Sequence, residues 1–400
     1  MRGVGQSPTV LEVLVMYNFD ELVDRRNTNS VKYDYAREMG KPANAIPLWI
    51  ADMDFKVPEE VEEALMKCAE HAVYGYTDTK DDYNHAVMGW FLSNFGFRSE
   101  PDWIIKTPSI LYAMAMAIRA FTDEGDSVLL QKPIYHSFEP IITRNDRKLI
   151  NNPLIYENGK YYIDFDDFER KIRDENVKIF ILCSPHNPVA RVWTADELYK
   201  MGQICLKYGC IVISDEIHCD IVYNGLKHHM FTNVCRDFAQ NAIICTAPSK
   251  TFNLAGLQCS NIFIPNEALR VKFTHEMDKL GHNRLNIMGL AACKSAYLHG
   301  GSWLAHLKKH LQSNIRLIQK FLADTTKVKM IEPEATYLMW LDFTAFNLPH
   351  QELDEMLLNA GLWLSSGISF GEEGAGFFRM NIACPTDTLK AALNNLKKVL

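Results

Sequence analysis

The sequence has no long hydrophobic run. Its apolar stretches, such as Ile179–Cys183, stop after a few residues, whereas a membrane-spanning helix needs about 20. The early apolar patch Val10–Val15 lacks the longer core and the small-residue cleavage site that a signal peptide requires. We interpret residues 1–15 as an N-terminal extension without a chemical role. These observations predict a cytoplasmic protein with no membrane partner.

The sequence also lacks C-x-x-C motifs and an excess of basic residues. Its ten cysteines are scattered singly, which argues against a disulfide scaffold or a zinc site, so we expect reduced thiols and no metal. Lys and Arg number 42 against 49 Asp and Glu, which gives a net charge of −7. A surface of this charge repels nucleic acid, and no nucleic-acid partner is expected.

Internal repeats, low-complexity tracts and long Pro-, Gly- or Ser-rich linkers are missing too, so any two domains should pack closely together. Through the middle of the chain, short β-rich runs alternate with helical patterns, which is typical of an α/β domain with a mainly parallel sheet. The predicted strands are residues 127–131, 178–183, 211–214 and 242–246, and the predicted helices are 110–121 and 194–208. Thr194 and Glu197 form a capping box at the start of the second helix. A helix over 303–322 and a strand over 337–343 then predict a smaller α+β domain.

Polar residues follow three of the predicted strands. Asn187 lies in Ser-Pro-His-Asn-Pro, Asp215 in Ser-Asp-Glu-Ile-His, and Lys250 in Pro-Ser-Lys-Thr-Phe-Asn. If the strands are parallel, their carboxyl ends share one edge of the sheet and the three side chains converge on a crevice there. Together they supply the amide, carboxylate and amine that a pyridoxal phosphate enzyme requires.

Each of these residue types has a separate chemical task. A lysine amine can form a Schiff base with the cofactor aldehyde and, once displaced by the substrate amine, move protons at Cα. An aspartate beside the pyridine nitrogen favours the protonated ring, and an asparagine N–H can bond the phenolate oxygen. Taken singly, Asp215 could be a cap, Asn187 part of a turn and Lys250 an ordinary loop residue. Their joint occurrence after successive strands favours the cofactor site.

Three further positions suit the phosphate and the ring of such a cofactor. The helix predicted from Ile110 would present its backbone N–H groups and the Ser109 hydroxyl to a phosphate, although Ser109 or Thr107 could equally cap that helix. Ser249, next to the lysine, is a second phosphate candidate. Tyr135 follows another strand and could stack on the pyridine ring or belong to the core.

One arginine lies in an apolar, strand-like segment near the C-terminus. Arginine is rarely buried without an anion, and Arg379 is flanked by Phe377, Phe378 and Met380. The α-carboxylate of an amino-acid substrate would satisfy it through a bidentate pair, and an internal salt bridge would do so equally well.

These residues belong to segments that resemble a known family. The sequence resembles the fold-type I pyridoxal phosphate enzymes of the aminotransferase class I/II superfamily and, within it, the MalY/PatB group of carbon–sulfur β-lyases, also called cystathionine β-lyases. The resemblance runs from about Tyr17 to the C-terminus. The matching segments are Asp-Arg-Arg-Asn-Thr at 24–28, Trp-Ile-Ala-Asp-Met-Asp-Phe at 49–55, Tyr-Gly-Tyr-Thr at 74–77, Ser-Pro-His-Asn-Pro at 184–188, Ser-Asp-Glu-Ile-His at 214–218, Ser-Lys-Thr-Phe-Asn-Leu-Ala-Gly-Leu at 249–257 and Arg-Met-Asn-Ile-Ala-Cys-Pro at 379–385.

The resemblance implies pyridoxal 5′-phosphate as the cofactor and the same roles for Lys250, Asp215, Asn187, Tyr135 and Arg379. It implies a large α/β domain over 59–294, with a mainly parallel sheet, and a smaller α+β domain built from both chain ends, 16–58 and 295–400. It adds Tyr76, which would reach the phosphate of the neighbouring subunit's cofactor and so imply a homodimer with shared active sites. It also implies that the Ile50–Ala51 backbone faces the amino-acid substrate.

The resemblance further implies α,β-elimination of sulfur amino acids to pyruvate, ammonia and a thiol. Three residues after the aspartate, many aminotransferases carry a tyrosine that bonds the cofactor phenolate, whereas this sequence has His218, as the lyase group does. An aminotransferase using the same residues is the first alternative. A binding or regulatory protein that keeps the fold is the second, although the intact Lys250, Asp215, Asn187 and Arg379 argue against lost catalysis.

The sequence departs from the family pattern at two positions. Ala190 stands where the family usually has glycine, and its Cβ would hinder a positive φ and put the position of the Asn187 loop in doubt. Pro108 replaces a common glycine and removes one N–H donor for phosphate. Both changes bear on cofactor affinity, because neither touches a catalytic atom.

Overall fold

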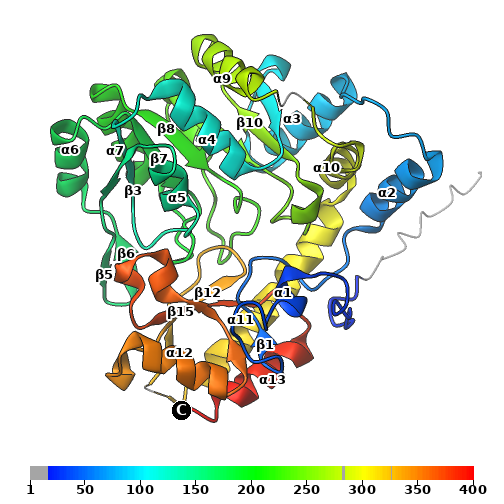
Figure 1. Ribbon diagram of the computed structural model, residues 1–400, viewed down its shortest axis with the longest axis vertical. Helices are drawn as coiled ribbons and strands as arrows, with labels where there is room; N and C mark the ends of the chain where they lie inside the picture. The colour runs from blue at the N-terminus through cyan, green and yellow to red at the C-terminus, as the bar shows by residue number, and fades with distance from the viewer. Residues whose placement is uncertain (1–16, 282–283, 326) are drawn as a thin grey trace, which may run out of the picture.

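The computed structural model describes residues 17–281, 284–325 and 327–400, which form two lobes (Figure 1). The predicted extension at residues 1–15 lies outside the described residues. The larger lobe contains the strands labelled β3, β7, β8 and β10 together with their covering helices, and the smaller lobe contains β12, β15 and α11 to α13 (Figure 1).

A seven-stranded sheet forms the centre of the large lobe, in the order β2-β10-β9-β8-β7-β3-β4. Only β10 runs opposite to the other six strands, so the prediction of a mainly parallel sheet is confirmed. The strands are β2 (Ile104–Thr107), β3 (Ser127–Leu130), β4 (Lys148–Asn151), β7 (Ile179–Cys183), β8 (Ile211–Asp215), β9 (Ala242–Thr246) and β10 (Ser260–Phe263). The four strands predicted from the sequence are all present to within one residue at each end.

Both faces of this sheet are covered by helices, and the alternation of side chains along the strands shows how. Ile179 and Ile181 of β7 pack with α4 (Ile110–Phe121), α5 (Phe138–Thr143) and α9 (Glu267–Lys279) on one face. Phe180 and Leu182 point to the other face and pack with α3 (Asp81–Phe95), α6 (Phe165–Asp174), α7 (Ala195–Lys207) and α10 (Ile287–His299). A strand buried on both faces reads as a continuous apolar run, which is why β7 was recognisable in the sequence.

Helix α7 begins at the predicted capping box, in which the Thr194 hydroxyl accepts from the Glu197 N–H and the Glu197 carboxylate accepts from the Thr194 N–H. The other elements of the large lobe are α2 (Glu59–His71), α8 (Phe231–Val234), β5 (Ile155–Glu157) and β6 (Lys160–Tyr162), whereas α1 (Val31–Asp34) lies beside the small lobe (Figure 1).

The small lobe is an antiparallel sheet with helices, and both ends of the chain contribute to it. Its sheet has the order β11-β12-β15-β14, and the short strand β1 from the N-terminal segment pairs with β13 near the C-terminus. The elements are β1 (Ile46–Pro47), α11 (Gly301–Leu322), β11 (Lys329–Met330), β12 (Leu338–Asp342), α12 (His350–Asn359), β13 (Leu362–Trp363), β14 (Ser365–Ser366), β15 (Phe377–Asn381) and α13 (Thr386–Leu396). The exact domain limits at 58 and 294 stay a prediction.

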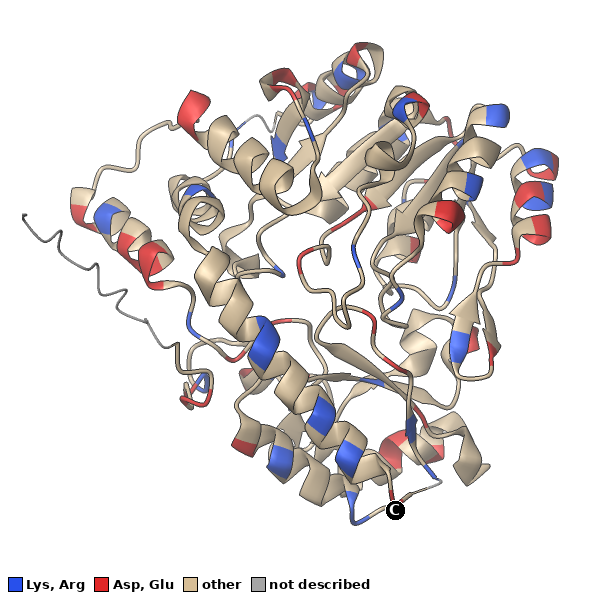
Figure 2. Ribbon diagram, turned by 180° about the vertical axis from the view of Figure 1, so that it is seen from behind, with Lys and Arg blue, Asp and Glu red and all other residues tan. Residues whose placement is uncertain are grey.

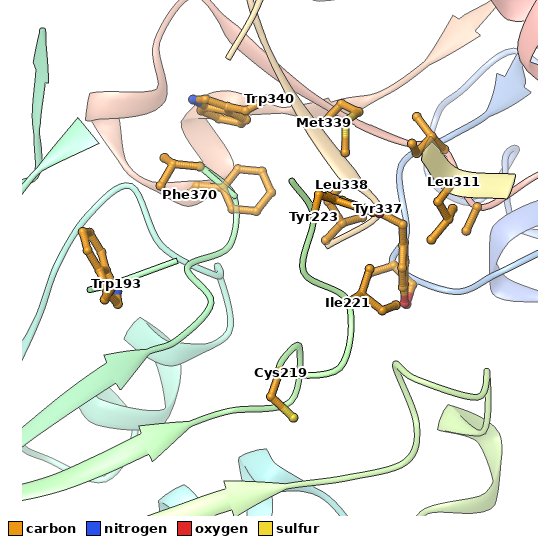
Figure 3. Packing of buried hydrophobic residues seen from close by; sticks show 14 of the residues in the cluster. Trp193, Cys219, Ile221, Tyr223, Leu311, Tyr337, Leu338, Met339, Trp340 and Phe370 are labelled. Carbon is orange, nitrogen blue, oxygen red and sulfur yellow. The ribbon is translucent and has the colours of Figure 1, made fainter. Parts of the chain in front are cut away.

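A continuous apolar cluster joins the two lobes. Ile221 and Tyr223, in the segment after β8, lie opposite Leu338 of β12 (Figure 3). The Tyr223 hydroxyl donates to the Thr336 carbonyl at 2.6 Å. The two lobes therefore pack directly against each other at the carboxyl edge of the large sheet, where the predicted site residues lie.

Charged residues lie on the outer helices, and the cysteines are not paired with one another. In the view of Figure 2, basic and acidic residues are both present on the outer helices, and the long helix α11 carries basic residues only. None of the helices formed by the described residues has the length and apolarity of a membrane span. All ten cysteines are free thiols, and eight of them are buried.

Candidate active site

A cavity of about 180 Å³ opens at the carboxyl edge of the large sheet. Loops that follow β2, β3, β7, β8 and β9 reach it, as expected for an α/β sheet. The predicted site residues that line this cavity are Ala51, Ser109, Ile110, Tyr135, Asn187, Asp215, His218, Ser249 and Lys250. The structure therefore brings together segments that are up to 199 residues apart, since Lys250 contacts Ala51 directly.

Lys250 lies in the loop after β9, and its Nζ donates to the Ala51 carbonyl at 2.6 Å. Burial lowers the pKa of this amine to about 8; Asp52 and Asp215 oppose the decrease, while Arg379 adds to it. No described carboxylate forms an ion pair with it. An amine of this kind is a better nucleophile and base near neutral pH than an ordinary lysine, because a far larger fraction of it is unprotonated.

Asp215 ends β8 and is buried at the base of the cavity. It accepts a hydrogen bond from the Ile217 N–H at 3.1 Å. Burial raises the pKa of this carboxyl to about 7, with a further increase from Glu216 and an opposing effect from Lys250. A carboxylate that has lost water without gaining a bonded cation suits a protonated ring nitrogen, which would supply both the charge and the hydrogen bond.

His218 and Tyr135 contribute rings to the cavity wall. His218 is buried, and within the described part of the chain its Nδ1 has no hydrogen-bond partner. Burial lowers the pKa of this imidazole to about 3, so the ring is neutral at pH 7. Tyr135 is only partly buried, packs edge-on against Phe138 at 5.5 Å between ring centroids, and lines the cavity. Its position fits the stacking role better than the core role.

Ser109 and Ile110 begin α4 beside the cavity. Ser109 is the N-cap, and its Oγ accepts from the Tyr112 N–H at 3.1 Å, so the capping interpretation is correct. Capping uses the oxygen as an acceptor and leaves the hydroxyl proton to donate, so it does not compete with phosphate binding. Ser249 also lines the cavity. A helix N-terminus at a cavity that two serines also line is a suitable place for a dianion.

Arg379 lies on β15 and reaches the site from the small lobe. Its guanidinium donates to Asn187 Oδ1 and to the Trp49 carbonyl, each at 2.9 Å, and to Ser365 Oγ at 3.2 Å. The residue is 3% exposed, and its Nε has no hydrogen-bond partner in the described ranges. No described carboxylate pairs with it, so an internal salt bridge is not what satisfies this cation. Burial lowers its pKa to about 10, and it remains charged at neutral pH.

Tyr76 does not line the cavity. Its side chain is 98% exposed, in a segment between α2 and α3 that is mostly exposed. The guanidinium of Arg284 lies 5.8 Å from its ring centroid. Its proposed contact with a neighbouring subunit stays a prediction.

Three neighbouring lining residues were missed by sequence reasoning: Gln258, Cys259 and Ser260. They lie at and just before the start of β10. An antiparallel strand begins at the edge where its parallel neighbours end, so its first residues meet the same crevice. Recognising β10 as antiparallel would have identified them, but no local sequence feature states strand direction.

Ala190 adopts the left-handed conformation with φ of 57° despite its Cβ. Its N–H donates to the His186 carbonyl at 2.8 Å, and its carbonyl accepts from Glu334 and Ala335 at 3.1 Å. These bonds keep the loop in place, so Asn187 still reaches the cavity. The doubt that this substitution raised about the loop is thereby removed.

Comparisons with known proteins agree with this geometry. The family model described as aminotransferase class I and II matches residues 43–396. Cystathionine beta-lyase PatB of Bacillus subtilis is 41% identical over 96% of this chain and 100% of its own length. Cystalysin of Treponema denticola, solved with pyridoxal 5′-phosphate, has a TM-score of 0.92 at 36% identity, covering 96% of this chain and 98% of its own. A provisionally assigned, pyridoxal phosphate-bound aminotransferase of Clostridium difficile 630 has a TM-score of 0.93 at 39% identity, covering 96% and 99%.

Proposed function

This chain belongs to the aminotransferase class I and II family, and we propose that it is a pyridoxal 5′-phosphate-dependent carbon–sulfur β-lyase of the cystathionine β-lyase kind. One observation carries the chemistry: Lys250, Asp215 and Asn187 converge on one cavity, beside a buried Arg379 that has no carboxylate partner among the described residues. The full-length similarity to cystathionine beta-lyase PatB supports the choice of elimination. We propose that it acts in the cytoplasm on sulfur-containing amino acids.

The residues of the cavity fit pyridoxal phosphate. Lys250 offers an amine for the aldehyde, Asp215 a buried carboxylate for the ring nitrogen, and Asn187 an amide N–H for the phenolate oxygen. The orphaned Nδ1 of His218 calls for a polar partner that the described residues do not supply. Ser109, the N-terminus of α4 and Ser249 would hold the phosphate. When bound, the cofactor supplies an electron-withdrawing ring that accepts the electron pair left at the substrate Cα.

The chain's own residues then orient the substrate and move its protons. Arg379 and Asn187 would bind the α-carboxylate, which places Cα beside Lys250. The Lys250 amine, with its pKa of about 8, removes the Cα proton. The Cβ–S bond breaks with its electron pair leaving on sulfur, which becomes a thiol on protonation. Hydrolysis of the remaining three-carbon unit gives pyruvate and ammonia.

The proposal includes a homodimer with shared active sites. Tyr76 is almost fully exposed, and Val73 and Tyr74 beside it are 64% and 60% exposed, which is unusual for apolar side chains on a monomer. A mixture of Tyr76→Ala and Lys250→Ala subunits tests this arrangement. Mixed dimers would regain one intact site and measurable activity, whereas two independent monomers would stay inactive after mixing.

The aminotransferase remains the second candidate, because the same lysine moves the proton in both reactions and the Clostridium difficile structure carries that name. The test is pyruvate release from L-cystathionine by the purified protein with added pyridoxal phosphate and no keto acid. Catalytic pyruvate formation supports the lyase. Absence of pyruvate, with amino acids converting the bound cofactor to its pyridoxamine form, would replace the lyase with the aminotransferase.

A further inference from the structure

Charged residues from two segments singled out in the sequence do not line the cavity but form one ion cluster beside it. Arg25, in segment 24–28, binds Asp52 through NH2 at 2.7 Å and NH1 at 3.2 Å. The same NH1 donates to Asp54 at 2.9 Å and to the Met53 carbonyl at 3.1 Å. The Arg25 guanidinium is thus hydrogen-bonded to three consecutive residues, 52–54, of segment 49–55.

Lys32 completes this cluster from α1. Its side chain is fully buried, with Nζ 2.8 Å from Asp54 and 3.7 Å from Asp52. The Tyr33 hydroxyl donates to Asp54 at 3.0 Å. Two cations therefore balance two carboxylates, which is the condition under which such charges can be buried without a large cost.

Segment 49–55 is also the segment that faces the site. Its Ala51 carbonyl accepts from Lys250 at 2.6 Å, and its Trp49 carbonyl accepts from Arg379 at 2.9 Å. Asn253, three residues after Lys250, accepts from the Met53 N–H at 2.9 Å and donates to the Met53 carbonyl at 3.0 Å. The backbone that Arg25 holds is thus bonded to the two groups on which the reaction depends.

We propose that Arg25 is a positioning residue. By holding Asp52, Met53 and Asp54 together, it fixes segment 49–55 so that its carbonyls orient the Lys250 amine and the Arg379 guanidinium. The consequence for turnover rests on the proposed function, but the consequence for the environment of Lys250 does not.

The cluster also acts on Lys250 through charge. The charged or titratable groups that influence Lys250 are Asp52, Arg379 and Asp215, and His218 beside it is neutral. Asp52 has the largest effect of these charges and favours the protonated amine. Asp52 in turn is held by Arg25, with Lys32 at the longer distance of 3.7 Å. Loss of Arg25 would leave two carboxylates with one close cation and displace Asp52.

Arg26 provides a matched control, because it is the adjacent arginine, its side chain is 71% exposed and its only ion pair with the described residues, to Asp24, is 4.0 Å long. The holoenzyme variants are Arg25→Gln, Asp52→Asn, the double variant, and Arg26→Gln. Their readouts are kcat and KM for L-cystathionine and the pH midpoint of the visible absorbance of the Lys250-bound cofactor, which needs no substrate.

Asp52→Asn should shift that midpoint to lower pH by about one unit, since an anion is lost. Arg25→Gln should shift the midpoint away from the wild-type value, because it leaves Asp52 without its nearest cation, and lower kcat/KM about tenfold or more, while Arg26→Gln matches the wild type. In the Asp52→Asn background, adding Arg25→Gln should cost less than about threefold, because Arg25 acts largely through Asp52. A purely structural role would lower the melting temperature without this coupling or this shift.

The proposal is overturned if Arg25→Gln and Arg26→Gln share one midpoint and one kcat/KM, or if the effects of Arg25→Gln and Asp52→Asn simply multiply. If Arg25→Gln does not fold, Arg25→Lys can replace it in the comparison with Arg26→Gln. A lysine ammonium cannot bond three residues at once as the planar guanidinium does. If the wild type forms no pyruvate, the lyase proposal fails, whereas the midpoints still decide the role of Arg25.

Discussion

The guanidinium of Arg379 donates a 2.9 Å hydrogen bond to the side-chain oxygen of Asn187, although the two residues are 192 positions apart. Asn187 follows β7 in the large lobe, and Arg379 lies on β15 in the small lobe. The bond therefore crosses between the lobes at the cavity. A substrate carboxylate placed on Arg379 would touch both lobes at once, so substrate binding and the fit of the lobes are linked.

Arg379→Ala should lower kcat/KM for L-cystathionine about 100-fold. Loss of a charge-assisted hydrogen bond costs up to about 3 kcal/mol, and each 1.4 kcal/mol is about tenfold. This decrease in kcat/KM should come mainly from a higher KM, because the carboxylate is bound in both the ground state and the transition state. Arg379→Lys keeps the charge without the fork and should be intermediate. An unchanged KM in Arg379→Ala would contradict the assignment.

Lys250→Ala should abolish pyruvate release and the visible absorbance of lysine-bound cofactor. The amine is both the attachment point and the base, so both signals depend on one atom. Lys250→Arg retains a cation of similar length and should be inactive as well, which separates loss of the amine from loss of charge. A Lys250→Ala protein with the wild-type rate would disprove the proposed mechanism.

The sequence predicted the large lobe well because its strands are buried on both faces. The five-residue apolar run of β7 and the capping box of α7 are local features, and both are confirmed. The strand ends were equally readable, since Asn187, Asp215 and Lys250 each follow such a run. Their convergence required only that the strands be parallel.

Contacts between segments far apart in the chain could not be predicted from such local sequence features. The bond from Lys250 to the Ala51 carbonyl spans 199 positions, and the ion cluster around Arg25 depends on the path of the N-terminal segment across the lobes. Gln258 and Ser260 enter the cavity only because β10 is antiparallel. Sequence periodicity reports burial and element type, whereas these contacts depend on direction and placement in space.

Asp215→Asn should stabilise the cofactor-free protein above pH 7. The pKa of Asp215 rises from 3.8 to about 7 on folding, so between these values the native state binds more protons than the unfolded state. Its contribution to stability therefore declines as the pH rises through this range and is fully unfavourable above pH 7. The gain is at most about 4 kcal/mol, since one pKa unit corresponds to about 1.4 kcal/mol.

Urea unfolding of the cofactor-free proteins at pH 5 to 8 measures this effect. The difference between Asp215→Asn and the wild type should widen as the pH increases. Asp387→Asn is the control, because that carboxylate is 92% exposed and its substitution should leave a pH-independent difference. A constant difference for Asp215→Asn would show that Asp215 is ionised in the folded protein throughout.

Ala190→Gly should raise the free energy of unfolding of the holoenzyme by about 1 kcal/mol and leave kcat unchanged. Ala190 holds a φ of 57°, where a Cβ costs about 1–2 kcal/mol, and part of the gain is offset because glycine has more freedom in the unfolded chain. Ala391→Gly, at an exposed position in the middle of α13, should lower stability by a similar amount, because a helix interior disfavours glycine. If both substitutions destabilise equally, the hydrogen bonds that Ala190 donates to His186 and accepts from Glu334 and Ala335 hold the loop without strain at Ala190. Opposite signs would show that the Asn187 loop carries strain that a glycine would remove.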